Sequence, residues 1–509
     1  MTRADDLLAE IRNAPRDDAP RQIYADLLAE GGDPDRAQLI QLQLRRAALP
    51  SWDPRTTELE LHERALLERR GAEWRAALPT LRGVTWGSFT RGFVGKVAFH
   101  SLEAFEAHRD ACFAASPVSS IALHWPSTAK PPKLAVIAAL DELTLVGTVM
   151  RPEDLKWLAG SPILSTLRSL SLLDSQIRAG LPHLLKSPHL SRLAALRLPL
   201  HLIGDAGISK LTAAALPALT ELDLSVGANE ALGSGRRTPA TATGARGALE
   251  LAAWPGLARI TSLDLSGAKL GRDGLTALLA SPYTKALTSL VLRAIPDSDW
   301  EMDDSLAAFA SGPAGALVEL DLSDNDLDGD AAAALSSCRA LQRLAVLRIE
   351  KVRSRHFERL AGAPWIHSLR VLSCGESALE PIIEVAPKQL HALRIVAEGT
   401  TARELVEKLT AVPLPALTSL DLSAARITDP SLRVLGATAS LPNLVAISLA
   451  PHGHGTPSFT PEGAAELASS PLGLRCKSVH TGIAELDRLA PPPPITIGHG
   501  DYSGPVRFL

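Results

Sequence analysis

The sequence contains few aromatic residues and few cysteines. Among its 509 residues are only 8 Trp, 3 Tyr, 9 Phe and 4 Cys. Because 46% of the residues are nevertheless hydrophobic, the core must consist mainly of aliphatic side chains. The four cysteines are far apart and form no Cys-x-x-Cys pair, which argues against a zinc ribbon, a redox pair and a disulfide framework.

An excess of one charge and long apolar runs are missing too. The 52 Lys and Arg residues nearly balance the 56 Asp and Glu residues, so the net charge of -4 supplies no general attraction for nucleic acid or anionic membranes. No 18 apolar residues follow one another, and acidic residues stand near the N-terminus where a secretory signal needs apolar ones. These absences predict a cytoplasmic protein that binds neither nucleic acid nor membrane.

Sequence motifs of catalysis are absent as well. There is no P-loop, no Gly-x-Ser-x-Gly elbow, no His-Glu-x-x-His and no dinucleotide-binding glycine motif in a strand-turn-helix context. His452, His454 and His499 could approximate a metal site, but no carboxylate or thiolate accompanies them at a fixed spacing, and a glycine-rich surface turn explains them better. We therefore expect no catalytic residue, no metal and no cofactor.

The main positive feature is an internal repeat. The pattern apolar-x-x-apolar-x-apolar recurs, for example as LTELDL at 219–224 and LTSLDL at 417–422. Each occurrence predicts a short strand, with the second apolar residue as its marker. The most frequent spacing is 26 or 27 residues, which leaves room for a strand, a turn and a helix. The predicted markers are Val97, Ile121, Leu143, Leu170, Leu196, Leu222, Leu263, Leu290, Leu320, Leu347, Leu369, Leu393, Leu420 and Ile447.

The segments between the strands have the pattern of helices. Residues 273–282 place their leucines on one apolar stripe that ends before a proline. Thr428-Asp429-Pro430 and Thr460-Pro461-Glu462 offer a capping oxygen before a proline at the first helical position, and Asp205 and Asp273 are expected to cap helices similarly. Since one repeat cannot bury its own leucines, neighbouring repeats must stack. The predicted fold is an α/β horseshoe with a parallel sheet on its concave face and helices on its convex face.

These repeats resemble the leucine-rich-repeat family, over about residues 90 to 475. The resemblance is to the helix-containing type found in ribonuclease inhibitor and in the activators of the Ran GTPase. It implies a non-catalytic scaffold that binds a protein partner on the concave surface, or alternatively an inhibitor or GTPase activator of a partner enzyme. One departure is that the expected turn asparagine occurs as Asn325, whereas equivalent positions include Ala268 and Ala425, so most of the usual turn hydrogen bonds should be missing.

Residues 1–80 lack the repeat period and predict a small all-helical domain. The segment 14–43 resembles the repeat-companion domain that precedes leucine-rich repeats in myxobacteria and planctomycetes, and residues 86–99 resemble the join in such proteins. The matching elements are Asp17-Asp18, Pro20-Arg21, Tyr24-Ala25-Asp26, Gly32-Asp33-Pro34 and Leu42-Gln43. This resemblance implies a bacterial protein and a domain order, not a chemistry. The helical domain could cap the first strand, or it could be a separate docking module.

The repeats should occupy residues 81–475, followed by a C-terminal cap and Pro-rich tail at 476–509. The spacing of 41 between Leu222 and Leu263 indicates an insertion at 226–248, which is rich in Gly, Ala and Thr and has no core pattern. We expect a mobile loop there. Its arginines could touch an anionic partner, although charges in loops are usually only solvated.

Candidate binding residues follow from the alternation of side chains along a strand. The residue after each marker should point to the concave surface. The aspartates at these positions are explained by the repeat wording LDLS, whereas a run of arginines in three successive repeats is less expected. It either forms a site for an acidic protein partner, or its side chains splay apart with Glu350 neutralising one of them. The candidate partner-binding residues are Asp223, Asp264, Asp321, Arg348, Arg370 and Arg394.

Overall fold

The computed structural model contains two compact units. The first unit comprises Met1–Leu49, Leu66–Leu270 and Tyr502–Leu509, and the second comprises Pro50–Ala65 and Gly271–Asp501. The structure describes residues 2–125, 137–147, 150–173, 177, 179–199, 203–226, 243–295, 303–311, 317–325, 327, 329–352, 357–397, 402–450 and 456–482. A short segment near the N-terminus, 50–65, therefore belongs with the C-terminal repeats.

The first unit begins with helices α1 (Arg3–Asn13), α2 (Ala19–Gly31) and α3 (Pro34–Ala47), and includes the second half of α4 (Arg55–Ala76). Local capping fixes their ends. The side chain of Thr2 accepts a hydrogen bond from the N–H of Asp5, and Asp33 accepts one from Arg36 just before Pro34. Helix α2 ends at Gly32, whose φ of 97° is left-handed. These segments are helical, as the sequence predicts, but they do not form a compact unit of their own.

Strands of the first unit follow one another in chain order. They are β1 (Val84–Trp86), β4 (Lys96–Phe99), β5 (Ser120–His124), β6 (Glu142–Val146), β7 (Ser169–Leu173), β8 (Ala195–Arg197), β9 (Glu221–Asp223) and β10 (Ser262–Asp264). Strand β1 is antiparallel to β4, whereas the later strands pair in parallel. A separate hairpin is formed by β2 (Phe89–Thr90) and β3 (Phe93–Val94). The connecting helices are α5 (Leu102–Ala115), α6 (Pro152–Ala159), α7 (Leu181–Leu185), α8 (Gly204–Thr212) and α10 (Ala245–Ala253).

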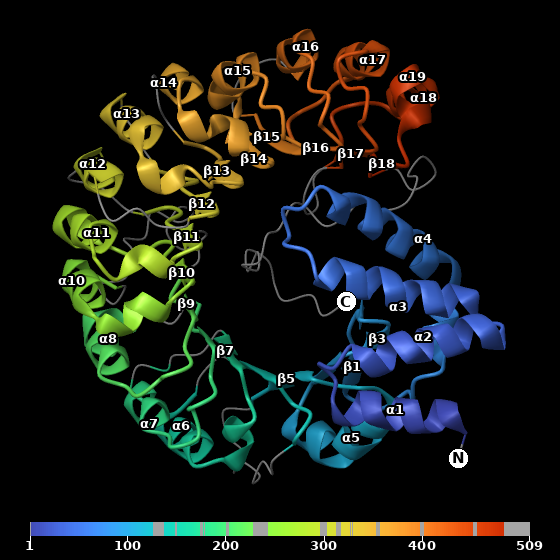
Figure 1. The fold of residues 1–509 in the computed structure, drawn as a ribbon, viewed down its shortest axis with the longest axis vertical. Helices are drawn as coiled ribbons and strands as arrows, with labels where there is room; N and C mark the ends of the chain where they lie inside the picture. Colours follow the sequence, from blue (N-terminus) through green and yellow to red (C-terminus); the bar gives the residue numbers. More distant parts are fainter. Residues whose placement is uncertain are drawn as a thin grey trace. The chain divides into compact units, whose positions relative to one another are not determined.

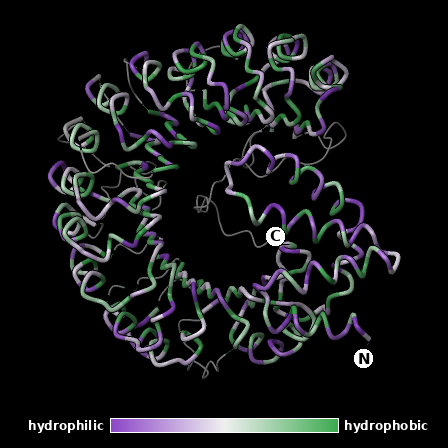
Figure 2. The backbone as a smooth tube through the Cα atoms, in the orientation of Figure 1, coloured by the Kyte–Doolittle hydropathy of each residue, from purple (hydrophilic) through white to green (hydrophobic). Residues whose placement is uncertain are grey.

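The second unit repeats the same strand-turn-helix arrangement. Its parallel strands are β11 (Ser289–Val291), β12 (Glu319–Asp321), β13 (Val346–Ile349), β14 (Val371–Gly375), β15 (Ala392–Val396), β16 (Ser419–Ala424), β17 (Ala446–Ser448) and β18 (Ser478–His480). Its helices are α11 (Gly271–Leu279), α12 (Asp303–Ser311), α13 (Gly329–Ser337), α14 (Glu358–Ala361), α15 (Glu376–Glu384), α16 (Ala402–Ala411), α17 (Asp429–Ala437), α18 (Pro461–Ser469) and α19 (Pro471–Arg475). Within this unit the strands form one side and the helices the other (Figure 1). Hydrophobic stretches recur in successive repeats (Figure 2).

Strand pairing confirms the predicted fold class, an α/β solenoid of leucine-rich repeats after a helical domain. Leucine pairs with leucine in neighbouring strands, as in Leu143↔Leu170 and Leu320↔Leu347. The structure also contains a repeat strand, β18, that the sequence pattern did not predict. Its Val479 pairs with Ile447. The confirmed markers are Val97, Ile121, Leu143, Leu170, Leu196, Leu222, Leu263, Leu290, Leu320, Leu347, Leu393, Leu420 and Ile447.

One predicted marker, Leu369, is wrong. Leu372 is the residue that pairs with Leu347 on one side and with Leu393 on the other. Leu369 lies three residues earlier, in the buried turn position that Leu390 holds in the next repeat. In the sequence LRVLSC both Leu369 and Leu372 fit the pattern. Leu369, Leu372 and Leu390 are all fully buried. The register of β14 therefore differs by three residues from the prediction.

Asn325 shows what the repeat asparagine does where it is present. Its Nδ2 donates hydrogen bonds of 2.7 Å to the carbonyls of Leu292 and Leu322, and its Oδ1 accepts one of 2.8 Å from the N–H of Ile295. The side chain is buried, so it satisfies backbone groups that water does not reach. Directly before it, Asp324 has a left-handed φ of 61°. This one amide joins two successive repeat turns.

The insertion is only partly described, since residues 227–242 lie outside the described part of the chain. The predicted loop is wrong for residues 245–248, which form the first turn of α10. Asp205 is also not the cap of its own helix, because Ile203 is the N-cap residue of α8. Instead, its Oδ1 accepts hydrogen bonds of 2.7 Å from the N–H of Gly244 and 3.0 Å from that of Gly247. It caps the helix of the following repeat.

Among the helices in the described ranges, none is long and apolar enough to cross a membrane.

Candidate functional site

The aspartates after the markers are held by the turn that follows each strand. Asp223, Asp264 and Asp321 each accept a hydrogen bond from the backbone N–H two residues later, at 2.9, 2.8 and 2.9 Å. Asp421 does the same at 2.9 Å. Asp223 and Asp264 are buried. The Asp of the motif LDLS therefore has a structural role, because its carboxylate accepts a hydrogen bond from a backbone N–H where the strand ends.

Two carboxylates of β12 face Arg348 of β13. Asp321 is the direct cross-strand partner of Arg348. Burial raises the pKa of Asp321 and of Glu319, and the nearby positive charge of Arg348 opposes both shifts. The three side chains form a cross-strand charge cluster rather than an open basic surface.

Arg394 of β15 lies between Asp421 of the neighbouring β16 and Glu350, which directly follows β13. Its Nε is 3.7 Å from Glu350 Oε1 and 3.7 Å from Asp421 Oδ2. Only 14% of its side chain is exposed. Glu350 also accepts a hydrogen bond from the hydroxyl of Ser373, which lies between Arg348 and Arg394 in the strand register. As the sequence suggested for one arginine of the run, Glu350 balances the charge of Arg394.

Arg370 does not share the strand position of Arg348 and Arg394. It precedes β14, and Ser373 occupies the place predicted for it. The expectation of three arginines in successive equivalent positions is therefore wrong, for the same reason that Leu369 is not a marker. The guanidinium of Arg370 instead lies 4.7 Å from the centre of the Trp52 ring, which is cation–π contact.

Trp52 is the site residue that the sequence did not reveal. It precedes α4, in the segment of residues 50–65 that belongs to the second unit. Its ring packs against an apolar floor at the beginnings of the strands, made by Ala345, Val346, Val371 and Ala392. The sequence feature that could have indicated it is a tryptophan in the Pro-containing linker PSWDP. A large aromatic residue outside any helix or strand needs another part of the chain to pack against.

Two further contacts hold this linker. The Nε2 of His391 and the carbonyl oxygen of Trp52 are 2.9 Å apart, and the hydroxyl of Ser51 hydrogen-bonds to Glu319. His391 is only 3% exposed, and burial lowers its pKa. Glu58, further along α4, forms a solvent-exposed ion pair of 3.2 Å with Lys477. The candidate site is thus the strand side of the second unit from β12 to β16, with residues 50–53 lying on part of it.

The strand side of the first unit carries a smaller polar group. Arg197 on β8 donates hydrogen bonds of 2.8 Å to Ser169 and 2.8 Å to Glu221, on the two neighbouring strands. Glu221 is 42% exposed and Arg197 is 27% exposed at the side chain. These residues form a cross-strand row next to the buried Asp223.

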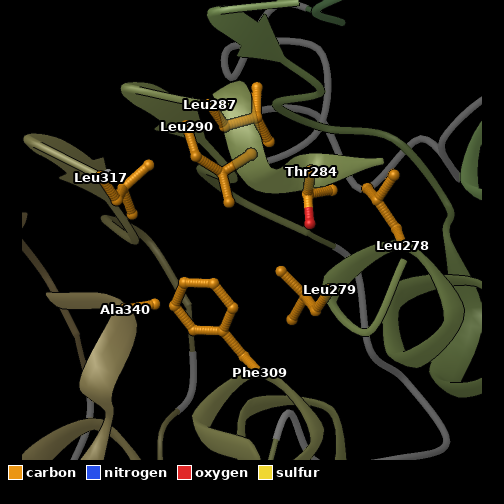
Figure 3. A pocket seen from close by; sticks show the side chains of 8 residues that line it. All are labelled: Leu278, Leu279, Thr284, Leu287, Leu290, Phe309, Leu317 and Ala340. Carbon is orange, nitrogen blue, oxygen red and sulfur yellow. The ribbon is translucent and has the colours of Figure 1, made fainter. Parts of the chain in front are cut away.

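An apolar cavity lies between repeats of the second unit. Figure 3 shows the ring of Phe309 from α12 facing leucines of α11 and of the neighbouring strands. Thr284 brings the one hydroxyl group, and it already donates to the carbonyl of Ser281 at 2.8 Å. With no free polar group to orient a ligand, the cavity is better explained as a gap in packing. Its lining residues are Leu278, Leu279, Thr284, Leu287, Leu290, Phe309, Leu317 and Ala340.

Within the described ranges, no three His, Cys, Asp or Glu side chains are grouped so that they could hold a metal ion. His452, His454 and His499 lie outside those ranges. The four cysteines are buried and form no disulfide bond. Burial raises the pKa of Cys112 to about 11 and raises that of Cys374 as well. Thiols of this kind are poor nucleophiles at neutral pH.

No family model and no curated protein matches the sequence. Among solved structures, the chain is similar to an internalin from Listeria monocytogenes, with 17% identity and a TM-score of 0.36 over 72% of this chain and 87% of that one. It is also similar to the Rad7 and Elc1 complex in yeast, with 15% identity and a TM-score of 0.33 over 64% of this chain and 78% of that one. With similarities this low, the function has to be argued from the residues of this chain.

Proposed function

We propose that the chain is a protein-binding scaffold and that the strand side of the second unit contacts the partner. The observation that carries this proposal is the set of charged side chains that parallel strands hold in fixed register there. Arg348 faces Asp321, and Arg394 lies between Glu350 and Asp421. Because these side chains are already ordered, a partner would lose little free energy in fixing them.

The charge pattern favours a partner with both signs of charge rather than a simply acidic one. The prediction of an acidic partner depended on three arginines in equivalent strand positions. The observed register shows that Arg370 does not occupy such a position. Each of the other two arginines lies beside carboxylates. Complementarity on such a surface sets orientation and specificity more than raw affinity.

The test is a charge-neutral double substitution on the strand side, Glu319→Gln with Arg348→Gln. It keeps the net charge, replaces Glu319 by its amide of equal size, and removes two of the three charges of the cluster. We expect capture of the native partner from a lysate of the source organism, quantified by mass spectrometry, to fall by about tenfold, since a lost interfacial charge pair costs on the order of 1.4 kcal/mol or more.

The matched control removes an ion pair on the helix side. Arg403 and Glu407 of α16 form an exposed i,i+4 pair of 2.7 Å, and their double change to Gln also leaves the net charge unaltered. This control should fold and capture the partner like the wild type. Equal capture by both double variants would place the binding surface elsewhere on the chain.

A further inference from the structure

The linker between α3 and α4 contacts the strand side of the second unit through side chains. Trp52 lies on the apolar floor and under Arg370, and its carbonyl oxygen meets His391. Its ring is only half-buried, so it rests on the sheet without being enclosed by it. The residues that receive it, Arg370, His391 and the floor of Ala345, Val346, Val371 and Ala392, are called the Trp52 seat below.

The seat offers a combination that fits a peptide. A guanidinium accepts an aromatic face, an imidazole meets a backbone carbonyl, and small aliphatic side chains form the base. The positive charge of Arg370 also acts on the carboxylate of Asp53 and helps to lower its pKa, for which hydrogen bonds from Arg55 are the main cause. The group that this seat accommodates is thus an aromatic side chain together with the carbonyl oxygen of the same residue.

The shape of the linker is fixed by contacts within itself. The carboxylate of Asp53 accepts hydrogen bonds of 2.8 Å from Nε and 2.8 Å from Nη2 of Arg55, and one of 3.0 Å from the Arg55 N–H. Thr56 donates its N–H and its hydroxyl to the carbonyl of Asp53, at 2.9 and 2.6 Å. The N–H of Asp53 bonds to the carbonyl of Pro50 at 2.9 Å. A turn held in this local way can form in a separate peptide of the same sequence.

We propose that the Trp52 seat is a peptide-binding subsite, which the chain fills with its own linker. A protein partner then enters by presenting an exposed turn with an aromatic residue, and it displaces residues 50–53. This inference rests on the proposed function, because it names the kind of partner that the strand side of the second unit receives. The linker competes as a tethered ligand, and its presence lowers the apparent affinity for any such peptide.

The experiment uses the full chain with Trp52→Ala and a fluorescent peptide of residues 48–57. If the linker fills the seat in nine molecules of ten, emptying the seat should tighten peptide binding by about tenfold, as measured by fluorescence anisotropy. Adding Arg370→Ala should abolish that binding, whereas adding Arg403→Ala on α16 should leave it unchanged. A peptide with alanine in place of its tryptophan should not bind.

Equal binding of the peptide to the wild type and to Trp52→Ala, or binding to neither, would overturn the inference. Should Trp52→Ala not fold, Arg370→Ala in the wild-type chain gives a second measurement by hydrogen exchange. Amides of residues 51–57 should then exchange faster than in the wild type, and unchanged exchange would count against the seat. None of these measurements uses the native partner, so their failure is distinct from failure of the proposed function.

Discussion

The aspartates of this molecule make different contacts, depending on the helix or strand that carries them. Asp321 closes its own turn, and Asp205 binds the helix of the next repeat. Sequence reasoning could explain the aspartates of LDLS as part of the repeat, because that pattern is local. It could not foresee that Arg394 lies between two acids, since Glu350 and Asp421 come from other repeats.

Asn325 is the residue for which the structure gives the sharpest stability prediction. Asn325→Ala leaves two carbonyls and one N–H without their buried partner, and we expect it to cost about 3 kcal/mol of unfolding free energy. The exposed Asn443, which donates one bond of 2.8 Å to the carbonyl of Pro415, is the control. Its change to alanine should cost less than about 1 kcal/mol. Urea unfolding followed by circular dichroism measures both, and equal midpoints would show that water replaces the Asn325 amide.

At the scale of strands and helices, the repeat pattern predicted most of what the structure shows. In LRVLSC two leucines three residues apart fit the repeat pattern equally well, so the sequence allows two strand registers. Only the pairing with Leu347 and Leu393 identifies Leu372 as the marker. Hydrogen bonds that cap a helix from the preceding repeat could also not be predicted from the sequence. Thr460 donates to Asp429 of the preceding helix through its N–H at 2.8 Å and its hydroxyl at 2.9 Å. Such contacts join residues about one repeat apart, and no local pattern indicates them.

The buried His391 beside the Trp52 linker should make the folded chain less stable at acidic pH. Burial lowers the pKa of His391 from its ordinary value of 6.5, Arg370 lowers it further, and the Trp52 carbonyl and Asp53 act in the opposite direction. In the folded chain this imidazole therefore binds fewer protons than in the unfolded chain. Its contribution to stability is present above pH 6.5 and is lost as the pH falls through the lowered pKa.

The measurement is urea unfolding of the full chain at pH 8 and pH 5.5. We expect His391 to lower the free energy of unfolding by up to about 1.4 kcal/mol at the lower pH, which is one unit below the ordinary pKa of histidine. His391→Gln keeps a side-chain N–H and cannot titrate, so it should lose less stability between the two pH values than the wild type. An equal loss in His391→Gln and in the wild type would assign the pH dependence to other groups.

On the scale of the whole molecule, the N-terminal helices pack against the short hairpin that precedes the repeats. Gln43 donates to the carbonyl of Phe89 at 2.9 Å and accepts from the N–H of Gly92 at 2.6 Å. Gly92 has a left-handed φ of 86°, and a Cβ there would lie 2.2 Å from the Cγ1 of Ile40. Arg36 stacks 5.1 Å from Phe89 and 5.4 Å from Phe93. The segments 14–43 and 86–99 thus meet in one contact, which favours the prediction that the helical domain is a cap.

Removal of residues 1–80 is the last prediction, and it tests this cap. The deletion uncovers Phe89 and Phe93 beside the first strands. It also removes the Trp52 linker and so uncovers the apolar residues under Trp52 in the second unit. We expect the truncated chain to aggregate or to lose the structure of its first repeats, as seen by light scattering and hydrogen exchange. The full chain with Trp52→Ala is the matched control, because it empties the seat and keeps the cap, and it should remain monodisperse. A soluble truncation with unchanged exchange in β4 and β5 would show that the helical domain is dispensable for folding, and would favour a docking module instead.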